Sequence, residues 1–111
     1  MVEKKAVRRG DVFLIALDPT IGREIKKTRP CVVLSPDDLN RHLSTVIVAP
    51  MTTGGHPYPF RVGCRFQKRD GFVVLDQIRA VDTHRLVRKL GRLSPQATAS
   101  SLGVLREMFV E

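Results

Sequence analysis

Short hydrophobic runs separated by turn residues dominate the first half of the chain. Residues 12–17, 32–34 and 45–49 are such runs, and they are rich in β-branched and other aliphatic side chains. Runs of this composition and length predict largely buried strands. Proline stands at the borders of the second and third runs, at Pro30, Pro36 and Pro50. Because proline cannot donate to a central sheet ladder, we expect these strands to begin or end there.

A second pattern, alternation, follows in the middle of the chain. Between residues 60 and 66, apolar side chains alternate with Arg61 and Arg65. This predicts a half-buried strand with a basic outer face. The pair Asp70-Gly71 is typical of a two-residue hairpin turn and should lead into a strand over residues 72–81. A last strand is expected over residues 87–93.

Two helices are expected as well. The stretch Ser35-Pro36-Asp37-Asp38 resembles the capped start of a short helix that ends near Arg41. Ser94-Pro95 begins a longer helix, with apolar residues at helical spacing from Leu102 to Phe109. Short strands followed by a terminal helix predict a mainly β fold, a small and strongly bent barrel with the C-terminal helix packed on it. At 111 residues, without repeats or linkers, the chain is expected to be one domain spanning 1–111.

Charge adds a prediction about partners. The chain has 19 basic and 11 acidic residues, a formal charge of +8, which favours a polyanionic partner. It has no apolar run near the ~18 residues of a membrane span. The N-terminal segment 1–10 is charged and lacks the apolar stretch of a secretion signal. Cys31 and Cys64 lie far apart in apolar runs, as expected for thiols in a reducing cytoplasm.

The residues that commonly bind metals do not gather in the sequence. His42, His56 and His84 are scattered, and the carboxylates are explained as helix-start or turn residues. We therefore expect no metal site, although groups distant in the sequence can converge in a fold. The chain also lacks a glycine-rich phosphate loop, and with 5% aromatic residues it offers little surface for base stacking.

Two polar residues beside prolines at strand ends remain as candidates for chemistry. Arg29 precedes Pro30, which biases Arg29 toward an extended backbone, so its guanidinium projects from a rigid strand. Thr52 lies two residues after Pro50. An arginine can hold a phosphate with two parallel hydrogen bonds, and a threonine adds a hydroxyl. Taken singly, each residue has an ordinary explanation, a solvated arginine and a turn threonine.

The ordered set of residues resembles the MazF/PemK toxins of bacterial toxin–antitoxin systems, nearly from end to end and with matching spacings. The residues that carry the resemblance are Gly10-Asp11, Asp18-Pro19-Thr20, Gly22, Glu24, Arg29-Pro30, Val32-Val33-Leu34-Ser35-Pro36, Asn40, Pro50, Thr52-Thr53, Tyr58-Pro59-Phe60 and Asp76-Gln77.

The resemblance implies an SH3-like barrel of the MazF/PemK/CcdB type, acting as a homodimer in the cytoplasm. It implies a metal-independent, sequence-selective endoribonuclease without a cofactor, which cleaves single-stranded RNA and is neutralised by an acidic antitoxin. The family's catalytic arginine and threonine correspond to Arg29 and Thr52, and an acidic residue in the first loop corresponds to Glu24. RNA contacts are expected from nearby residues, namely Arg23, Lys26, Lys27, Thr53, His56 and Gln77.

Two other functions fit the sequence. One is a non-enzymatic toxin of the same fold that poisons gyrase, as CcdB does; the match at Arg29 and Thr52 speaks against it. The other is a nucleic-acid-binding barrel without chemistry. In the enzyme reading, the 2′-hydroxyl of the RNA attacks its own phosphorus, while Arg29 and Thr52 stabilise charge on the phosphoryl oxygens. By its pKa, Glu24 is a more natural general base than an arginine, but the sequence does not place it.

Overall fold

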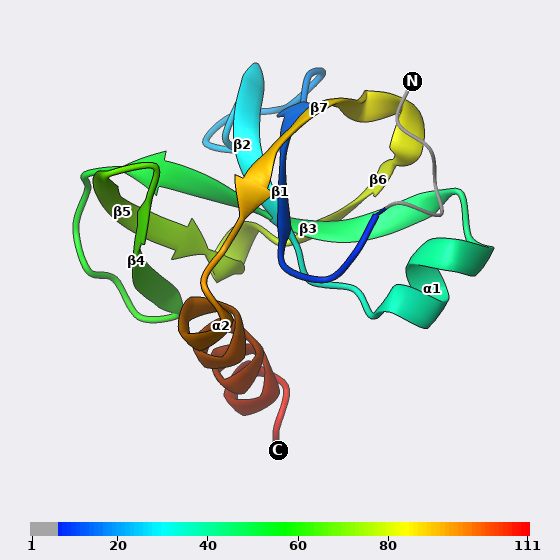
Figure 1. Cartoon of the computed structure of the whole chain (residues 1–111). Coiled ribbons are helices and arrows are strands. Elements are labelled where there is room, and N and C mark those ends of the chain that lie inside the picture. Colours follow the sequence, from blue (N-terminus) through cyan, green and yellow to red (C-terminus); the bar gives the residue numbers. More distant parts are fainter. Residues whose placement is uncertain (1–6) are drawn as a thin grey trace.

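The hydrophobic runs form the strands of one strongly bent antiparallel sheet, seen in a computed structural model that describes residues 7–111 (Figure 1). The elements in chain order are β1 (Asp11–Ala16), β2 (Thr28–Val33), α1 (Asp37–His42), β3 (Thr45–Thr53), β4 (Arg61–Phe66), β5 (Arg69–Val74), the 3-10 turn η2 (Leu75–Gln77), β6 (Arg79–Asp82), the 3-10 turn η3 (Thr83–Arg85), β7 (Leu86–Arg92) and α2 (Pro95–Met108). The charged segment 1–10, in which no secretion signal is expected, lies partly outside the described residues. No helix among these elements is long and apolar enough to span a membrane.

Strand β3 connects the two halves of the sheet. The strands run in the order β4-β5-β3-β2-β1-β7, and β6 also pairs with β3. The first half of β3 pairs with β6, up to Val48 opposite Arg79. Its last residues pair with β5 instead, from Met51 to Thr53. This change of partner bends the sheet, and with α2 at the C-terminus it confirms the mainly β, barrel-like fold predicted from the sequence.

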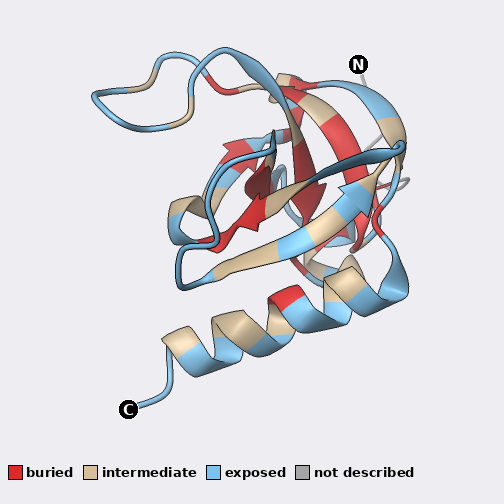
Figure 2. Ribbon diagram, turned by 90° about the vertical axis from the view of Figure 1, so that its left-hand side faces the viewer, coloured by how far each residue is buried: buried red, intermediate tan, exposed pale blue. Residues whose placement is uncertain are grey.

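The core has two parts, one on each face of the central strands. Along β2 and at the residue after it, Cys31 and Val33 belong to one hydrophobic cluster, and Val32 and Leu34 belong to the other. Burial on both faces explains why this run is continuous rather than alternating. Helix α2 covers the second cluster with residues that include Leu102 (Figure 2). The predicted helix start is confirmed, because the Ser94 hydroxyl accepts a hydrogen bond from Ala97 N.

Two prolines lie inside strands, so the predicted strand limits at Pro30 and Pro50 were wrong. Pro30 pairs with Leu14 of β1, and Pro50 pairs with Cys31 of β2. Each proline is tolerated because it lies where the strand has a partner on one side only. The pairing of β2 with β3 begins after Pro30, and β3 exchanges β6 for β5 around Pro50. A missing N–H therefore costs no ladder bond.

The hairpin predicted at Asp70-Gly71 was also wrong. The turn consists of Gln67 and Lys68, both with positive φ, and Phe66 pairs with Arg69 across it. Gly71 lies within β5, where a Cβ atom would be 1.7 Å from the carbonyl oxygen of Thr52. The glycine thus serves a close approach of two backbones and not a turn.

The structure differs from three smaller predictions as well. The strand expected over 72–81 is interrupted by η2, which separates β5 from β6. Ser35 does not cap α1; its buried hydroxyl donates to Asn40 Oδ1 at 2.5 Å and accepts from Ile47 N at 3.0 Å. Phe109 lies just beyond α2 and is exposed.

Gly71→Ala should lower the free energy of unfolding by more than about 2 kcal/mol, because the new methyl group overlaps backbone that cannot move aside. Gly63→Ala on the neighbouring strand is the matched control, since its Cβ would meet only Phe72 at 3.9 Å. Urea unfolding measures both variants. Equal stability of the two variants would contradict the close approach.

Candidate functional site

Arg29 and Thr52 are placed by the pairing of β2 with β3. The last pair of that ladder is Cys31 with Pro50. When the antiparallel register is continued for two more residues, Arg29 comes opposite Thr52. Both residues line one open pocket of about 360 Å³, together with Lys26 and Thr53. The two strand-end candidates therefore share a site, which the sequence suggested but did not locate.

The Arg29 side chain is exposed, and little holds its guanidinium. Arg29 Nε donates to the Lys26 carbonyl at 3.3 Å. The ion pairs formed among residues 7–111 do not include Arg29. Its remaining N–H groups can therefore hold an anion in the pocket without first giving up a carboxylate partner.

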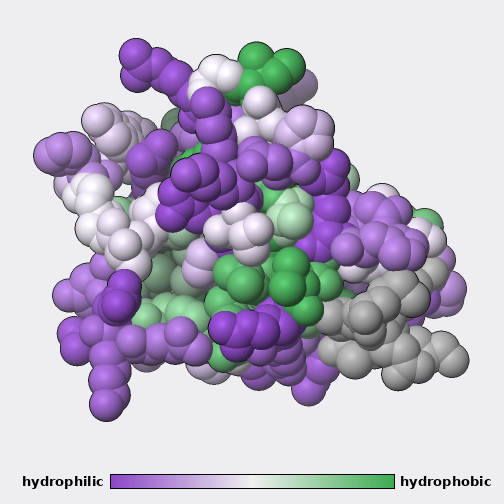
Figure 3. All heavy atoms as spheres, turned by 90° about the horizontal axis from the view of Figure 1, so that it is seen from above, coloured by the Kyte–Doolittle hydropathy of each residue, from purple (hydrophilic) through white to green (hydrophobic). Residues whose placement is uncertain are grey.

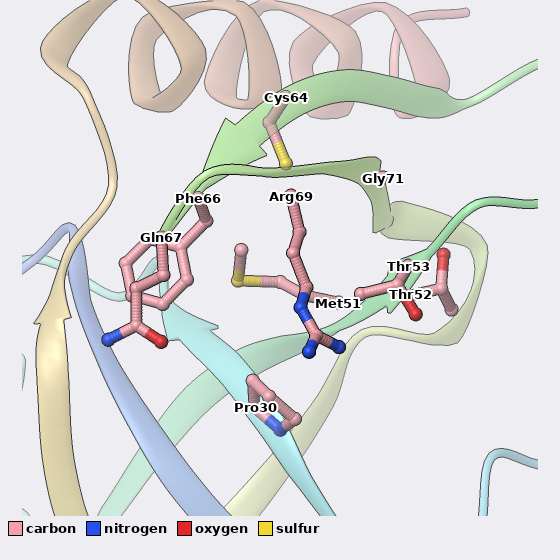
Figure 4. A pocket seen from close by; sticks show the side chains of 9 residues that line it. All are labelled: Pro30, Met51, Thr52, Thr53, Cys64, Phe66, Gln67, Arg69 and Gly71. Atoms are coloured by element: carbon pink, nitrogen blue, oxygen red, sulfur yellow. The ribbon is translucent and has the colours of Figure 1, made fainter.

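A second pocket adjoins the first and shares four lining residues with it: Pro30, Met51, Thr52 and Thr53. Its volume is about 390 Å³. The β4–β5 hairpin supplies the rest of the lining, including Gln67 and Arg69 (Figure 4). The sequence does not identify Gln67 and Arg69 as site residues, because its pattern predicts the turn at Asp70-Gly71 instead. The correct turn places Gln67 in the loop and Arg69 at the start of β5, next to the strand that carries Thr52.

Glu24 and Gln77 lie in a neighbouring pocket and not in the one that contains Arg29. They line a space of about 250 Å³, which adjoins the Arg29 pocket at Ile25. Glu24 Oε1 accepts a hydrogen bond from Ile21 N at 2.5 Å. Gln77 Oε1 accepts one from Ile25 N at 2.8 Å. In this arrangement both side chains hold the β1–β2 loop in shape.

The remaining candidates are exposed around this site. Arg23 and Lys27 belong to the β1–β2 loop, and the Lys27 carbonyl accepts a hydrogen bond from Leu17 N. His56 lies in the loop after β3, and its ring is edge-on to the Tyr58 ring, with 6.1 Å between the ring centroids. None of the three lines the pocket of Arg29 and Thr52. That these three residues contact RNA stays a prediction.

The two cysteine thiols and the metal-binding residue types offer no other chemistry within residues 7–111. Burial raises the pKa of the Cys31 thiol to about 12, and burial also raises that of Cys64. Neither thiol is an activated nucleophile. Within residues 7–111, no group of three or more His, Cys, Asp or Glu side chains comes together in a way that could hold a metal ion.

The net charge of the chain and the exposure of its basic side chains favour binding of an extended polyanion. Figure 3 views the molecule from above and shows hydrophilic side chains over most of that face, with hydrophobic ones between them. Among the exposed residues of the β1–β2 loop are Arg23, Lys26 and Lys27. With a formal charge of +8, such a surface attracts phosphates without selecting a sequence.

Comparison with known proteins identifies relatives of this arrangement. The family model described as "PemK-like, MazF-like toxin of type II toxin-antitoxin system" matches residues 8–109. The endoribonuclease toxin MazF of Escherichia coli K12 is 35% identical over 97 residues, covering 86% of this chain and 87% of that protein. The endoribonuclease MazF of Staphylococcus epidermidis is 37% identical over 94 residues, covering 79% and 78%.

Solved structures agree with the sequence relatives. MazF from Deinococcus radiodurans superimposes with a TM-score of 0.81 at 25% identity, covering 92% of this chain and 94% of that one. A mycobacterial endoribonuclease in complex with its cognate antitoxin has a TM-score of 0.68 at 25% identity, covering 88% and 96%.

Gln77→Ala should loosen the β1–β2 loop, because Ile25 N loses its acceptor. We expect trypsin to cut the folded Gln77→Ala variant after Arg23 and Lys26 about fivefold faster than it cuts the wild type. The loss of one hydrogen bond of ~1 kcal/mol corresponds to this factor. Gln77→Glu is the matched control, since a carboxylate oxygen accepts the same bond. Mass spectrometry of the fragments measures the rates. If Gln77→Ala were cut at the wild-type rate, Gln77 would not hold the loop.

Proposed function

The chain belongs to the PemK-like, MazF-like toxins of type II toxin–antitoxin systems, and from this premise we propose that it is an endoribonuclease that cleaves single-stranded RNA. The observation that carries the proposal is the shared pocket of Arg29 and Thr52, in which the arginine has no carboxylate partner among residues 7–111. Two curated relatives that are 35% and 37% identical are named as endoribonucleases, which supports it. The same names argue against a gyrase-poisoning toxin and against a barrel without chemistry.

The proposed reaction uses a nucleophile that the RNA already contains. The 2′-hydroxyl oxygen bonds to the adjacent phosphorus, and the bond from phosphorus to the 5′-oxygen breaks. The products are a 2′,3′-cyclic phosphate and a 5′-hydroxyl, so the 2′-hydroxyl loses a proton and the leaving oxygen gains one. The protein must align the phosphodiester and stabilise charge on its two free oxygens. Arg29 offers a planar pair of N–H donors, and Thr52 offers a hydroxyl.

The two donors in the pocket do not account for the transfer of the proton from the 2′-hydroxyl. An arginine guanidinium has N–H donors but no acceptor atom, so Arg29 is unsuited to take the proton. Glu24 has the appropriate chemistry but lies in the neighbouring pocket, beyond Ile25, and bonds to its own loop. For Glu24 to act as the base, the β1–β2 loop must bring its carboxylate past Ile25. We propose no step that needs a metal ion, because arginine and hydroxyl donors can neutralise the developing charge.

Arg29→Ala and Arg29→Lys should each slow cleavage about a hundredfold or more, comparable to the loss of one oxyanion-stabilising donor. Lysine keeps the charge but loses the planar fork, so it should not restore the rate. Thr52→Ala should show a smaller loss. The measurement is single-turnover cleavage of labelled RNA in EDTA, with mapping of the product ends.

The same experiment separates catalysis from binding. RNA affinity should fall far less than the rate, since the chain has 19 basic residues. Thermal melting should be unchanged, because an exposed strand-end side chain contributes little to stability. Arg88→Ala, at an exposed position on β7 outside the pockets described above, is the charge-matched control. Cleavage that needed an added divalent ion, or normal cleavage by Arg29→Lys, would refute the mechanism.

The proposed partners follow from charge and exposed apolar surface. A mycobacterial relative was solved in complex with its cognate antitoxin. For this chain, with its formal charge of +8, an acidic antitoxin would bind the exposed basic residues. A homodimer would cover part of the exposed apolar surface, which includes Ile47, Phe60 and Val87. We place this action in the cytoplasm, because single-stranded RNA is the proposed substrate.

An acidic chain encoded beside this gene should inhibit cleavage, and its inhibition should weaken as salt rises, because exposed charges are screened. Titration at two salt concentrations measures this, and light scattering of the free toxin measures the dimer. Cleavage that is insensitive to the acidic chain would count against the antitoxin, and an active monomer at micromolar concentration would count against the dimer.

A further inference from the structure

The loop that precedes Arg29 orients its guanidinium. Arg29 Nε donates to the Lys26 carbonyl at 3.3 Å. A hydrogen bond of this length biases a side chain rather than locking it, so the direction of the guanidinium depends on where the Lys26 carbonyl lies. Lys26 and its neighbour Ile25 also line the pocket of Arg29 and Thr52. The position of this end of the β1–β2 loop therefore decides how Arg29 presents its remaining N–H groups.

Lys26 is held from both sides in the chain. On one side, the Lys27 carbonyl accepts a backbone hydrogen bond from Leu17 N at 3.0 Å. On the other side, Ile25 N donates to Gln77 Oε1 at 2.8 Å. The second bond is made by a side chain from 52 residues away, which does not itself line the pocket of Arg29. Gln77 thus fixes the chain one residue before the carbonyl that Arg29 uses.

An ion pair holds the turn η2, to which Gln77 belongs. Arg61 at the start of β4 donates two bonds to the carboxylate of Asp76, the residue before Gln77, at 3.1 and 3.3 Å. The Tyr58 ring covers this guanidinium, with 4.9 Å between Arg61 Cζ and the ring centroid. Phe60 has a φ of 62°, a strained backbone for a bulky residue that persists only where neighbouring contacts hold it. A planar guanidinium held in this way fixes the carboxylate in direction as well as in distance.

We propose that Gln77 and Arg61 are positioning residues for Arg29. Gln77 keeps the Lys26 carbonyl where Arg29 Nε can reach it, which leaves the two terminal NH₂ groups of Arg29 for an anion in the pocket. Arg61 acts one step further away, because it holds the turn that carries Gln77. The proposal rests on the proposed function for what Arg29 does to RNA, but not for how its guanidinium is held. It differs from a direct contact of Gln77 with RNA, whose effect would not depend on Arg29.

Solvent exchange of the arginine Nε–H protons, measured by NMR, tests the proposal without any cleavage. Arg29→Lys removes the Arg29 signal and so identifies it. In Gln77→Ala the Arg29 Nε–H should exchange about fivefold faster, the factor for the loss of one ordinary hydrogen bond. In Arg61→Ala it should exchange about threefold faster, within the range of partly exposed ion pairs. The Arg9 Nε–H donates to the Leu34 carbonyl at 2.8 Å, and as the internal control it should be unchanged.

Single-turnover cleavage of labelled RNA measures the effect on the reaction. Gln77→Ala should slow the cleavage step about fivefold and leave the Kd for RNA within about twofold. In the Arg29→Ala background the same change should slow it by less than about 1.5-fold, because the residue through which Gln77 acts is gone. Arg61→Ala should slow the step about threefold. Arg65→Ala is its matched control, since Arg65 forms an exposed ion pair with Asp70 on the same hairpin, and it should keep the wild-type rate.

The outcomes separate this proposal from the proposed function. Unchanged exchange of the Arg29 Nε–H in Gln77→Ala would overturn it even if the protein cleaves RNA. A loss of rate that persists in the Arg29→Ala background would also overturn it, and would make Gln77 a direct contact to RNA. Faster exchange at Arg29 in both variants, with an unchanged Arg9 signal that shows each variant to be folded, supports it even if no cleavage is seen. In that last case only the proposed cleavage activity would fail.

Discussion

The short ladder between β2 and β3 is the constraint on which the site depends. It joins Cys31, Val32 and Val33 to Pro50, Ala49 and Val48, and both faces of these strands are buried. A slip of one residue would exchange the two hydrophobic clusters, so the register is fixed by the core. Beyond the last pair the two strands continue toward solvent, and there they carry Arg29 and Thr52. The core therefore sets which polar residues face each other at its edge.

The prolines beside these residues belong to the same constraint. Pro30 lies just before the pairing of β2 with β3 begins, and Pro50 lies where β3 exchanges β6 for β5, so the backbone at both places lacks an N–H that another strand could use. An unpaired strand edge invites further pairing, and proline blocks it. The site can thus remain open at the end of a sheet without becoming a surface for strand addition. The rigid φ of proline also limits the movement of Arg29 on its strand.

The sequence predicted the strands and the terminal helix more accurately than it predicted turns. It named Arg29 and Thr52 as candidates at two strand ends, and the structure places both at one pocket. Composition indicates which runs are buried, because apolar side chains dominate the free energy of folding. Gly71 shows why turns are harder: the same Asp-Gly pair suits a hairpin and a close backbone approach, and only the neighbouring strand decides between them. The roles of Glu24 and Gln77 in holding the β1–β2 loop depend on hydrogen bonds to Ile21 and Ile25, and the bond from Ile25 to Gln77 spans 52 residues.

Charge and shape contribute differently to the recognition of a ligand by this molecule. A formal charge of +8 raises affinity for any phosphate chain, and its effect falls with salt. It cannot distinguish one base from another, since phosphates carry no sequence information. Selectivity therefore has to come from donors and acceptors held in fixed positions. The β4–β5 hairpin is held at two places: its turn is bonded to β7 through Gln67 and Leu90, and β5, which begins at Arg69, pairs with the end of β3 that carries Thr52. A hairpin held at both places keeps its side chains in fixed positions beside the pocket of Arg29 and Thr52.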